Sequence, residues 1–314
     1  MNRRLGIIDL GTNTFHLLIV EKTSAGLITL FRESRPARIG QGGINLRTIT
    51  EAALARALEV LRYFRETLDQ YQVPAHRTHA FGTSAIRNAE NRAAFCDTIL
   101  HETGIDVTVI DGDQEAQYIY HGVRSALDLG SDNALIVDIG GGSVEFIIGN
   151  QEQLFWKQSF EIGGQRLMER FMRHDPLTES DRKRLYGYFE EQLIPLTNAV
   201  HQYAPSLLIG SSGTFDTLVD MDYQHRLGEW PPRSQTGFEL PVEEFYRSYE
   251  LLLTRSHDER LQLPGMIELR VDMIVVAVCL IDYLLRAYEL RQMRVSTYAL
   301  KEGVLAQKGL ELDL

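Results

Sequence analysis

The chain has 314 residues, of which 44% are hydrophobic and 24% are charged. These proportions are typical of a soluble globular protein, and the length suits two domains. The formal net charge of −11 argues against a general nucleic-acid binder, which would show a basic surplus, so we expect no DNA binding. The longest apolar run, residues 273–281, is too short to cross a bilayer. We therefore expect a cytoplasmic protein that does not associate with membranes.

The first half of the chain predicts a sheet whose later strands alternate with helices. Thr48 and Glu51 have the spacing of a capping box, which would open a long helix ending before Pro74. Cys96, like Cys279 further on, lacks the spacing of a metal site, and both are expected to be buried free thiols. The other expected elements are strands at 5–11, 15–21, 27–33, 77–82 and 105–110, a helix at 91–103 and a helix from about Gln114.

The second half repeats this order of elements. The expected elements are strands at 134–139, 144–149, 153–160, 206–210 and 293–297, helices at 164–173, 178–200, 267–288 and 298–308, helices from about Phe215 and Pro241, and a surface loop at 228–237. Three strands followed by alternating helices and strands, twice over, predict an α/β protein with two domains and a cleft between them. We place the domains at residues 1–124 and 125–314, with the last helix as a candidate to pack back on the first domain.

One segment occurs twice in the chain. Residues 7–19 read IIDLGTNTFHLLI, and residues 136–148 read IVDIGGGSVEFII. In each copy an apolar strand ends on an aspartate, Asp9 or Asp138, and a glycine turn with a hydroxyl residue leads into a second strand. A single copy would be explained equally well as a structural hairpin. Two copies with the same spacing favour a functional interpretation.

The two turns have the composition of phosphate-binding loops. Glycine lets the backbone approach a ligand, successive N–H groups form an anion-binding nest, and serine or threonine adds a hydroxyl donor. The aspartate that precedes each turn could hold a metal ion or its water shell. The candidate phosphate-binding residues are Gly11, Thr12, Asn13 and Thr14 in the first copy and Gly140, Gly141, Gly142 and Ser143 in the second.

A third turn, formed by Ser212, Gly213 and Thr214, follows a predicted strand and opens a helix. The N-terminus of a helix after such a turn is a ready phosphate site. An ordinary strand-to-helix loop would have the same appearance, so this interpretation depends on the two turns above.

Two charged residues follow further turns. Glu115 opens a helix, where the helix dipole alone would favour a carboxylate. Beside the phosphate loops it becomes the candidate base that orients an attacking water. Arg87 follows a Gly-Thr-Ser turn and is about equally well explained as a surface helix residue or as a phosphate contact.

Several of these segments together resemble the exopolyphosphatase and guanosine pentaphosphate phosphohydrolase family, within the actin, Hsp70 and sugar-kinase superfamily. The similarity extends from Ile7 to about Val304. The matching segments are IDLGTNT at 8–14, RIGQG at 38–42, GTSAIR at 82–87, EA at 115–116, VDIGGGS at 137–143, SGT at 212–214 and LKEGV at 300–304.

The resemblance implies two actin-like (ribonuclease H-like) domains that hold a phosphate chain in their cleft with help from Mg²⁺. It places Glu115 at the family's catalytic glutamate, Asp138 and Glu145 at its metal-handling carboxylates, and Arg38 and Arg87 near the substrate. Asp9, which matches Asp138 in the repeat, is a further candidate at the metal or the water. The implied reaction releases terminal orthophosphate from polyphosphate by in-line attack of water, and the implied assembly is a homodimer.

The chain departs from the family pattern at Gln114, Val144 and Lys301, where an acidic residue, a hydroxyl residue and arginine are more usual. The choice between polyphosphate and guanosine pentaphosphate as substrate stays open. Two other classes of protein also stay open, a sugar-kinase-like phosphotransferase and a non-catalytic sensor of phosphate or nucleotide.

Overall fold

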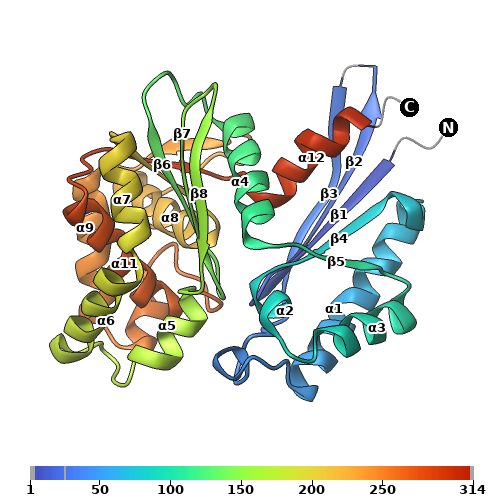
Figure 1. Cartoon of the computed structure of the whole chain (residues 1–314), viewed down its shortest axis with the longest axis horizontal. Helices are drawn as coiled ribbons and strands as arrows, with labels where there is room; N and C mark the ends of the chain where they lie inside the picture. The colour runs from blue at the N-terminus through green and yellow to red at the C-terminus, as the bar shows by residue number, and fades with distance from the viewer. Residues whose placement is uncertain (1–3, 25, 312–314) are drawn as a thin grey trace. The chain divides into compact units, whose positions relative to one another are not determined.

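The structure is a computed structural model that describes residues 4–24 and 26–311 (Figure 1). The chain divides into two compact units. The first unit consists of Met1–His121 together with Leu300–Leu314, and the second of Gly122–Ala299. Helix α12 (Leu300–Glu311) therefore belongs to the first unit, although it follows the second unit along the chain.

The first unit is built on a five-stranded sheet. Its strands are β1 (Arg4–Leu10), β2 (Thr14–Thr23), β3 (Gly26–Pro36), β4 (Thr78–Gly82) and β5 (Val107–Val109). Their order is β3-β2-β1-β4-β5; β1, β2 and β3 are antiparallel neighbours, whereas β4 runs parallel to β1 and β5 parallel to β4. The carboxyl ends of β1, β4 and β5 consequently meet at one edge, where ligands of open α/β sheets commonly bind.

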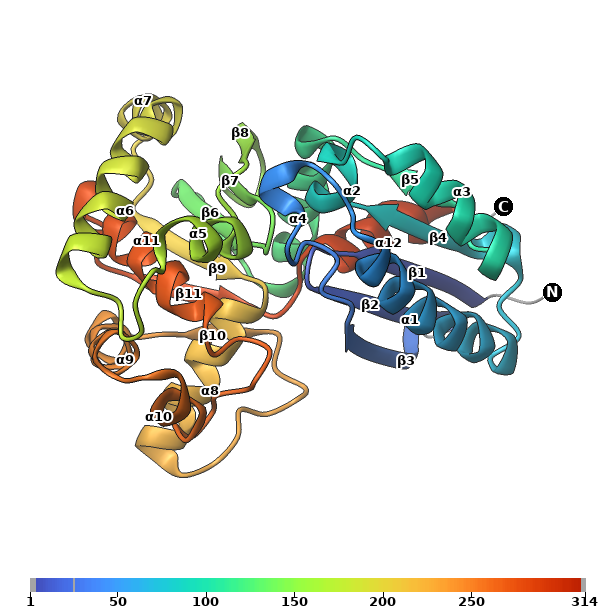
Figure 2. The same cartoon turned by 90° about the horizontal axis from the view of Figure 1, so that it is seen from below.

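Helices cover both faces of this sheet. Figure 2 shows α1 (Glu51–Gln70) in front of the sheet and α12 behind it. The hydroxyl of Thr50 accepts the Ala53 N–H at 3.2 Å, so the cap of α1 is Thr50 and the predicted capping box from Thr48 is wrong. The other helical elements of this part are short 3₁₀ turns at Ile44–Leu46 and Ala75–Arg77, then α2 (Ser84–Asn88), α3 (Arg92–Thr103) and α4 (Gly112–Ala126).

The second unit repeats the strand order of the first. Its strands are β6 (Ala134–Ile139), β7 (Val144–Gly149), β8 (Leu154–Phe160), β9 (Leu207–Ser211), β10 (Gly237–Glu239) and β11 (Met293–Ser296). The sheet order β10-β11-β9-β6-β7-β8 contains the same series, with β8, β7, β6, β9 and β11 in the places of β3, β2, β1, β4 and β5. Only β10 is additional, pairing antiparallel with β11 at the edge. The predicted duplicated α/β architecture is confirmed.

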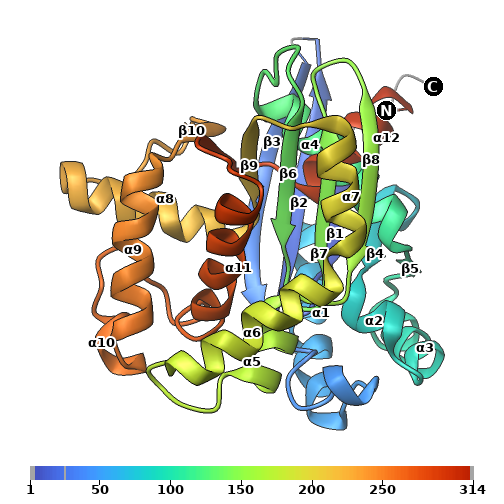
Figure 3. The same cartoon turned by 60° about the vertical axis from the view of Figure 1, so that its left-hand side comes forward.

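The helices of the second unit pack around a core of aliphatic and aromatic side chains. They are α5 (Gly164–Phe171), α6 (Glu179–Gln192), α7 (Ile194–Tyr203), α8 (Gly213–Leu227), α9 (Val242–Thr254), α10 (His257–Leu261) and α11 (Met273–Ala287). Figure 3 shows α11 between α6 and α9, and α7 lying across β7 and β8, in agreement with their contacts.

Three expectations about the second unit need correction. The helix expected at 178–200 is two helices, because Pro195 stands in the first turn of α7 and cannot donate a backbone hydrogen bond to a continuing helix. The helix expected at 267–288 begins only at Met273, and the residues before it form turns. Strand β10 lies partly inside the expected surface loop.

Two further expectations concern the whole chain. None of the helices in the described ranges combines the length and apolarity that crossing a membrane requires. Both cysteines are free thiols and Cys279 is buried, but Cys96 is only half-buried, so the expectation of burial is wrong for that residue.

Candidate functional site

The turn between β1 and β2 is tightly built. A side chain at Gly11 would place its Cβ 2.8 Å from the Thr14 carbonyl oxygen, so only glycine fits there. Thr12, Asn13 and Thr14 are all buried. The Thr14 Oγ1 atom has no hydrogen-bond partner among the described residues. A buried hydroxyl without a partner is costly, and this one is available to donate to an anion.

Arg38 is held against this turn by its backbone. The Asn13 carbonyl accepts the N–H groups of Ala37 and Arg38, both at 2.9 Å. From the other side, Arg56 donates to the Arg38 carbonyl at 2.7 Å. Arg38 has a φ of 46°, a left-handed conformation that a side chain disfavours. Such strain persists only where the surroundings impose it, and it is common at binding sites.

Arg87 of α2 and Glu115 of α4 form an ion pair. Arg87 follows β4 and Glu115 follows β5, and Nη1 of the arginine donates to Oε2 of the glutamate at 2.6 Å. Their side chains are only 13% and 9% exposed. The hydroxyl of Thr83, the residue directly before α2, donates to the Leu10 carbonyl at the end of β1. The pair therefore lies at the same sheet edge as the Gly11 turn.

The second unit carries two carboxylates at the corresponding hairpin. Asp138 of β6 and Glu145 of β7 are direct partners in the antiparallel ladder, as Asp9 and His16 are in the first unit. Both carboxylates are buried, at 6% and 1% exposure. Each accepts two serine hydroxyls, from Ser211 and Ser212 to Asp138 at 2.7 Å each, and from Ser143 and Ser159 to Glu145 at 2.7 and 2.6 Å.

In the turn at residues 140–143 the glycine carbonyls are hydrogen-bonded within the protein, whereas three backbone amides are available to a ligand. The carbonyls of the three glycines accept N–H groups from residues 163–165 at 2.8 to 3.3 Å, and Arg166 donates to one of them at 2.7 Å. The N–H groups of Gly141, Gly142 and Ser143 donate to no atom of the described residues. Successive unpaired amides of this kind form an anion-binding nest.

The turn at residues 212–214 lies next to Asp138. Ser212 has a φ of 74°, again strained for a non-glycine residue, and its hydroxyl donates to Asp138. A Cβ at Gly213 would overlap the guanidinium of Arg270, so that arginine packs directly on the turn. Thr214 is buried in the first turn of α8.

Arg270 is the residue of this site that the sequence interpretation missed. The sequence places it near the start of the helix expected at 267–288, whereas it stands in the turns before α11. Its Nε atom is buried and has no hydrogen-bond partner among the described residues. Burial lowers the pKa of the Arg270 guanidinium, while Asp216 and Asp138 act in the opposite direction. The available signal was a charged residue at the border of an apolar helix, after the turn at Pro264.

The second unit could bind Mg²⁺ if waters and substrate phosphates complete the coordination of the ion. Among the described residues, no three histidine, cysteine, aspartate or glutamate side chains gather as metal ligands. An all-protein cage is therefore not formed. Mg²⁺ usually takes one or two carboxylates, keeps several waters and binds substrate phosphates. Asp138 and Glu145, facing each other across β6 and β7, fit that mode of binding.

The three residues that depart from the family pattern, Val144, Gln114 and Lys301, each have an ordinary structural environment. Val144 is fully buried in the core of the second unit. The Gln114 N–H donates to the Asp111 carboxylate at 2.7 Å and so helps to close the start of α4. Lys301 lies 3.3 Å from Glu302, which Arg32 also contacts at 3.0 Å.

Comparison with known proteins gives one family for nearly the whole chain. The model of the Ppx/GppA phosphatase family matches residues 18–311. An exopolyphosphatase crystal structure from Cytophaga hutchinsonii has a TM-score of 0.94 and 47% identity, covering 99% of this chain and 98% of that one. The Ppx/GppA family member of Aquifex aeolicus has a TM-score of 0.81 and 25% identity over the full length of both chains.

Curated relatives match part of the chain. A guanosine-5'-triphosphate,3'-diphosphate pyrophosphatase of Photobacterium profundum is 33% identical over 68% of this chain. A bifunctional 3-dehydroquinate synthase/phosphatase of Fusobacterium nucleatum is 32% identical, also over 68%. The matched part spans only 42% and 33% of those two proteins.

Proposed function

Because the chain belongs to the Ppx/GppA phosphatase family, we propose that it is a phosphohydrolase that releases terminal orthophosphate from inorganic polyphosphate. The single observation that carries this proposal is the buried pair of Arg87 and Glu115 beside the Gly11 turn. A carboxylate fixed in one orientation next to a phosphate loop has what is needed to orient a water molecule for in-line attack. Phosphoryl transfer otherwise requires mainly positioning and stabilisation of charge.

In this proposal the turns bind the phosphate chain. The amides of residues 141–143 and the hydroxyl of Thr14 donate to phosphate oxygens. Arg38 and Arg87 offset charge on the transferred group, and Arg270 offers a further cation beside the turn at Gly213. Each unit carries one such turn, at the corresponding place in its own sheet.

The carboxylates of the second unit are proposed to handle magnesium. Asp138 and Glu145 would hold Mg²⁺, in part through water, and their serine partners fix the orientation of both carboxylates. Bound Mg²⁺ supplies positive charge to the phosphate chain. Asp9 occupies the equivalent position in the first unit and is a further candidate for binding a metal ion or a water molecule.

Polyphosphate is preferred over guanosine pentaphosphate as the proposed substrate for a specific reason. The exopolyphosphatase of Cytophaga hutchinsonii matches the whole chain at 47% identity. The guanosine-5'-triphosphate,3'-diphosphate pyrophosphatase matches 68% of the chain at 33%. The second substrate therefore remains the alternative. A homodimer and a cytoplasmic location stay predictions of the sequence.

The decisive experiment measures phosphate released from each substrate with added Mg²⁺. Faster release from polyphosphate supports the proposal, and faster release from guanosine pentaphosphate selects the alternative. A phosphorylated acceptor in place of free phosphate would identify a sugar-kinase-like transferase. Tight binding of both substrates without any turnover would identify a non-catalytic sensor.

A further inference from the structure

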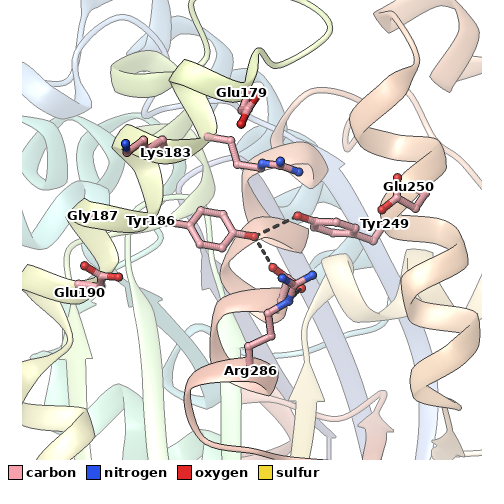
Figure 4. A pocket seen from close by; sticks show the side chains of 10 residues that line it. Glu179, Lys183, Tyr186, Gly187, Glu190, Tyr249, Glu250 and Arg286 are labelled. Atoms are coloured by element: carbon pink, nitrogen blue, oxygen red, sulfur yellow. Dashed lines mark hydrogen bonds and ion pairs between the residues drawn. The ribbon is translucent and has the colours of Figure 1, made fainter.

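A pocket of about 500 Å³ lies within the second unit, among α6, α9 and α11 (Figure 4). This volume is in the range of small-molecule sites. None of its lining residues belongs to the phosphate turns or the carboxylates described above. Along α11, the lining residue Asp282 stands ten residues beyond Asp272, which precedes the helix beside Arg270. Ten helical residues span about 15 Å.

The floor of the pocket is a network of hydroxyls around a buried carboxylate. Asp282 is 1% exposed and accepts the Tyr186 hydroxyl at 2.5 Å. The same hydroxyl lies 3.1 Å from the hydroxyl of Tyr249, and Figure 4 shows the two tyrosines pointing toward each other. Arg286 pairs with the same carboxylate at 2.7 Å. Burial raises the pKa of both tyrosines, so their hydroxyls stay protonated. The negative charge of Asp282 is therefore already matched inside the pocket.

Two cations of the pocket lining, Arg182 and Lys183, have no carboxylate partner among the described residues, and of these Lys183 is exposed to solvent whereas Arg182 is not. The side chain of Arg182 is partly buried and lies beside the hydroxyl of Tyr249. Among the described residues it forms no ion pair, although the chain has a net charge of −11. The other acids of the lining, such as Glu190 and Glu250, are exposed to solvent. A guanidinium without a counter-ion in a cavity favours binding of a carboxylate or phosphoryl group.

The glycine at position 187 is a second feature that favours a bound ligand in this pocket. It stands in the interior of α6 and lines the pocket. Its backbone has no positive φ, and a Cβ built on it would meet nothing within 4 Å. Glycine is less favourable than alanine in a helix interior. Neither backbone conformation nor packing explains a glycine here, but its missing side chain keeps the pocket open.

We propose that this pocket binds a small organic anion. Its carboxylate or phosphoryl group pairs with Arg182, and its body lies over Gly187 beside the rings of Tyr186 and Tyr249. The proposal does not depend on the proposed phosphohydrolase function, because it uses other residues and requires no turnover.

The test is calorimetric titration of the full chain with two probes, succinate for the carboxylate class and ribose 5-phosphate for the phosphomonoester class. At least one probe is expected to bind with a saturable heat. Arg182→Met should weaken that binding by about tenfold or more, as the loss of a hydrogen bond to a charged group does. Gly187→Leu should weaken it similarly, because the added side chain occupies the space of the ligand.

Two controls separate this site from the rest of the protein. Arg173→Met removes an exposed arginine outside the pocket and should leave binding unchanged. Gly187→Ala should raise the thermal unfolding temperature of the protein, which shows that the helix tolerates a side chain there. Failure of both probes to bind the wild-type protein would overturn the proposal. So would binding that survives both Arg182→Met and Gly187→Leu, because the probe would then bind elsewhere, for example at the phosphate turns.

Discussion

Arg87 donates a 2.6 Å hydrogen bond to Glu115, and the pair is largely withdrawn from solvent. The two residues are 28 positions apart in the chain, and the parallel pairing of β4 with β5 brings together the helices α2 and α4 that follow these strands. The arginine fixes the direction of the carboxylate before any substrate binds. Preorganised geometry of this kind is what a group that orients a water molecule requires.

Replacement of Glu115 by glutamine should separate catalysis from binding. The amide keeps the shape of the side chain but removes the base, so we expect phosphate release to fall by about a hundredfold or more. Binding of substrate, measured by titration, should be retained. The matched control is Asp113→Asn, at the other acidic residue in the first turn of α4. Wild-type turnover in a correctly folded Glu115→Gln protein would refute the assignment.

Arg270 and Gly213 should behave as one functional unit. Arg270→Met removes a cation beside the phosphate turn, and we expect a loss of about a hundredfold in kcat/KM, similar to the loss of one preorganised donor in other enzymes. Gly213→Ala should cause a comparable loss, because its Cβ displaces the same guanidinium. The double variant should be little worse than either single one. Losses that multiply in the double variant would show that the two residues act separately.

Removal of magnesium should abolish phosphate release. If Asp138 and Glu145 hold Mg²⁺, activity should be lost in excess chelator and return when Mg²⁺ is added. Asp138→Asn should raise the Mg²⁺ concentration that gives half-maximal rate, because a neutral amide binds the ion more weakly. The measurement is a Mg²⁺ titration of both proteins at fixed substrate. Full activity in metal-free buffer would contradict the proposed role of these carboxylates.

Short phosphate chains should be hydrolysed at least as well as long ones. Holding a long polyanion requires an extended basic surface, whereas this chain has 43 acidic and 32 basic residues. In the proposed site, Arg38 and Arg87 would serve only the last few phosphates. We therefore expect release of the substrate between cleavages. An end-labelled polymer at limiting enzyme should give a graded ladder on a gel, and full-length polymer beside only very short products would show processive digestion instead.

The stability of the folded protein should fall as the pH rises from about 4 to about 6, because of Asp220. Burial raises the pKa of this carboxyl from 3.8 to about 6 in the folded protein. The folded state therefore keeps a proton that the unfolded state loses first, so this contribution to stability decreases as the pH rises through that range. Asp220→Asn should be more stable than the wild type in urea unfolding at neutral pH. The difference should disappear near pH 4, and an equal difference at both pH values would contradict this explanation.

The sequence alone determined the duplicated architecture and the segments that carry the glycine turns. The repeated strand, aspartate and glycine turn are encoded by neighbouring residues, and local chemistry suffices to identify them. The order β3-β2-β1-β4-β5 in the first unit and its counterpart in the second follow the same repeat. Local sequence patterns of this kind predict the folded structure well, because buried strands joined by tight turns have few alternative arrangements.

The tertiary structure decided which side chains contact one another. Arg270 could not be recognised from its own neighbours, because its place depends on a loop returning from residue 263 to pack on Gly213. The serine partners of Asp138 are Ser211, at the end of β9, and Ser212, directly after it, which stand more than seventy residues further along the chain. Such contacts arise from the pairing of β6 with β9. No local sequence pattern predicts these contacts. The sequence gives the order of the strands and helices along the chain, but the packing of the folded chain determines which of their ends lie together.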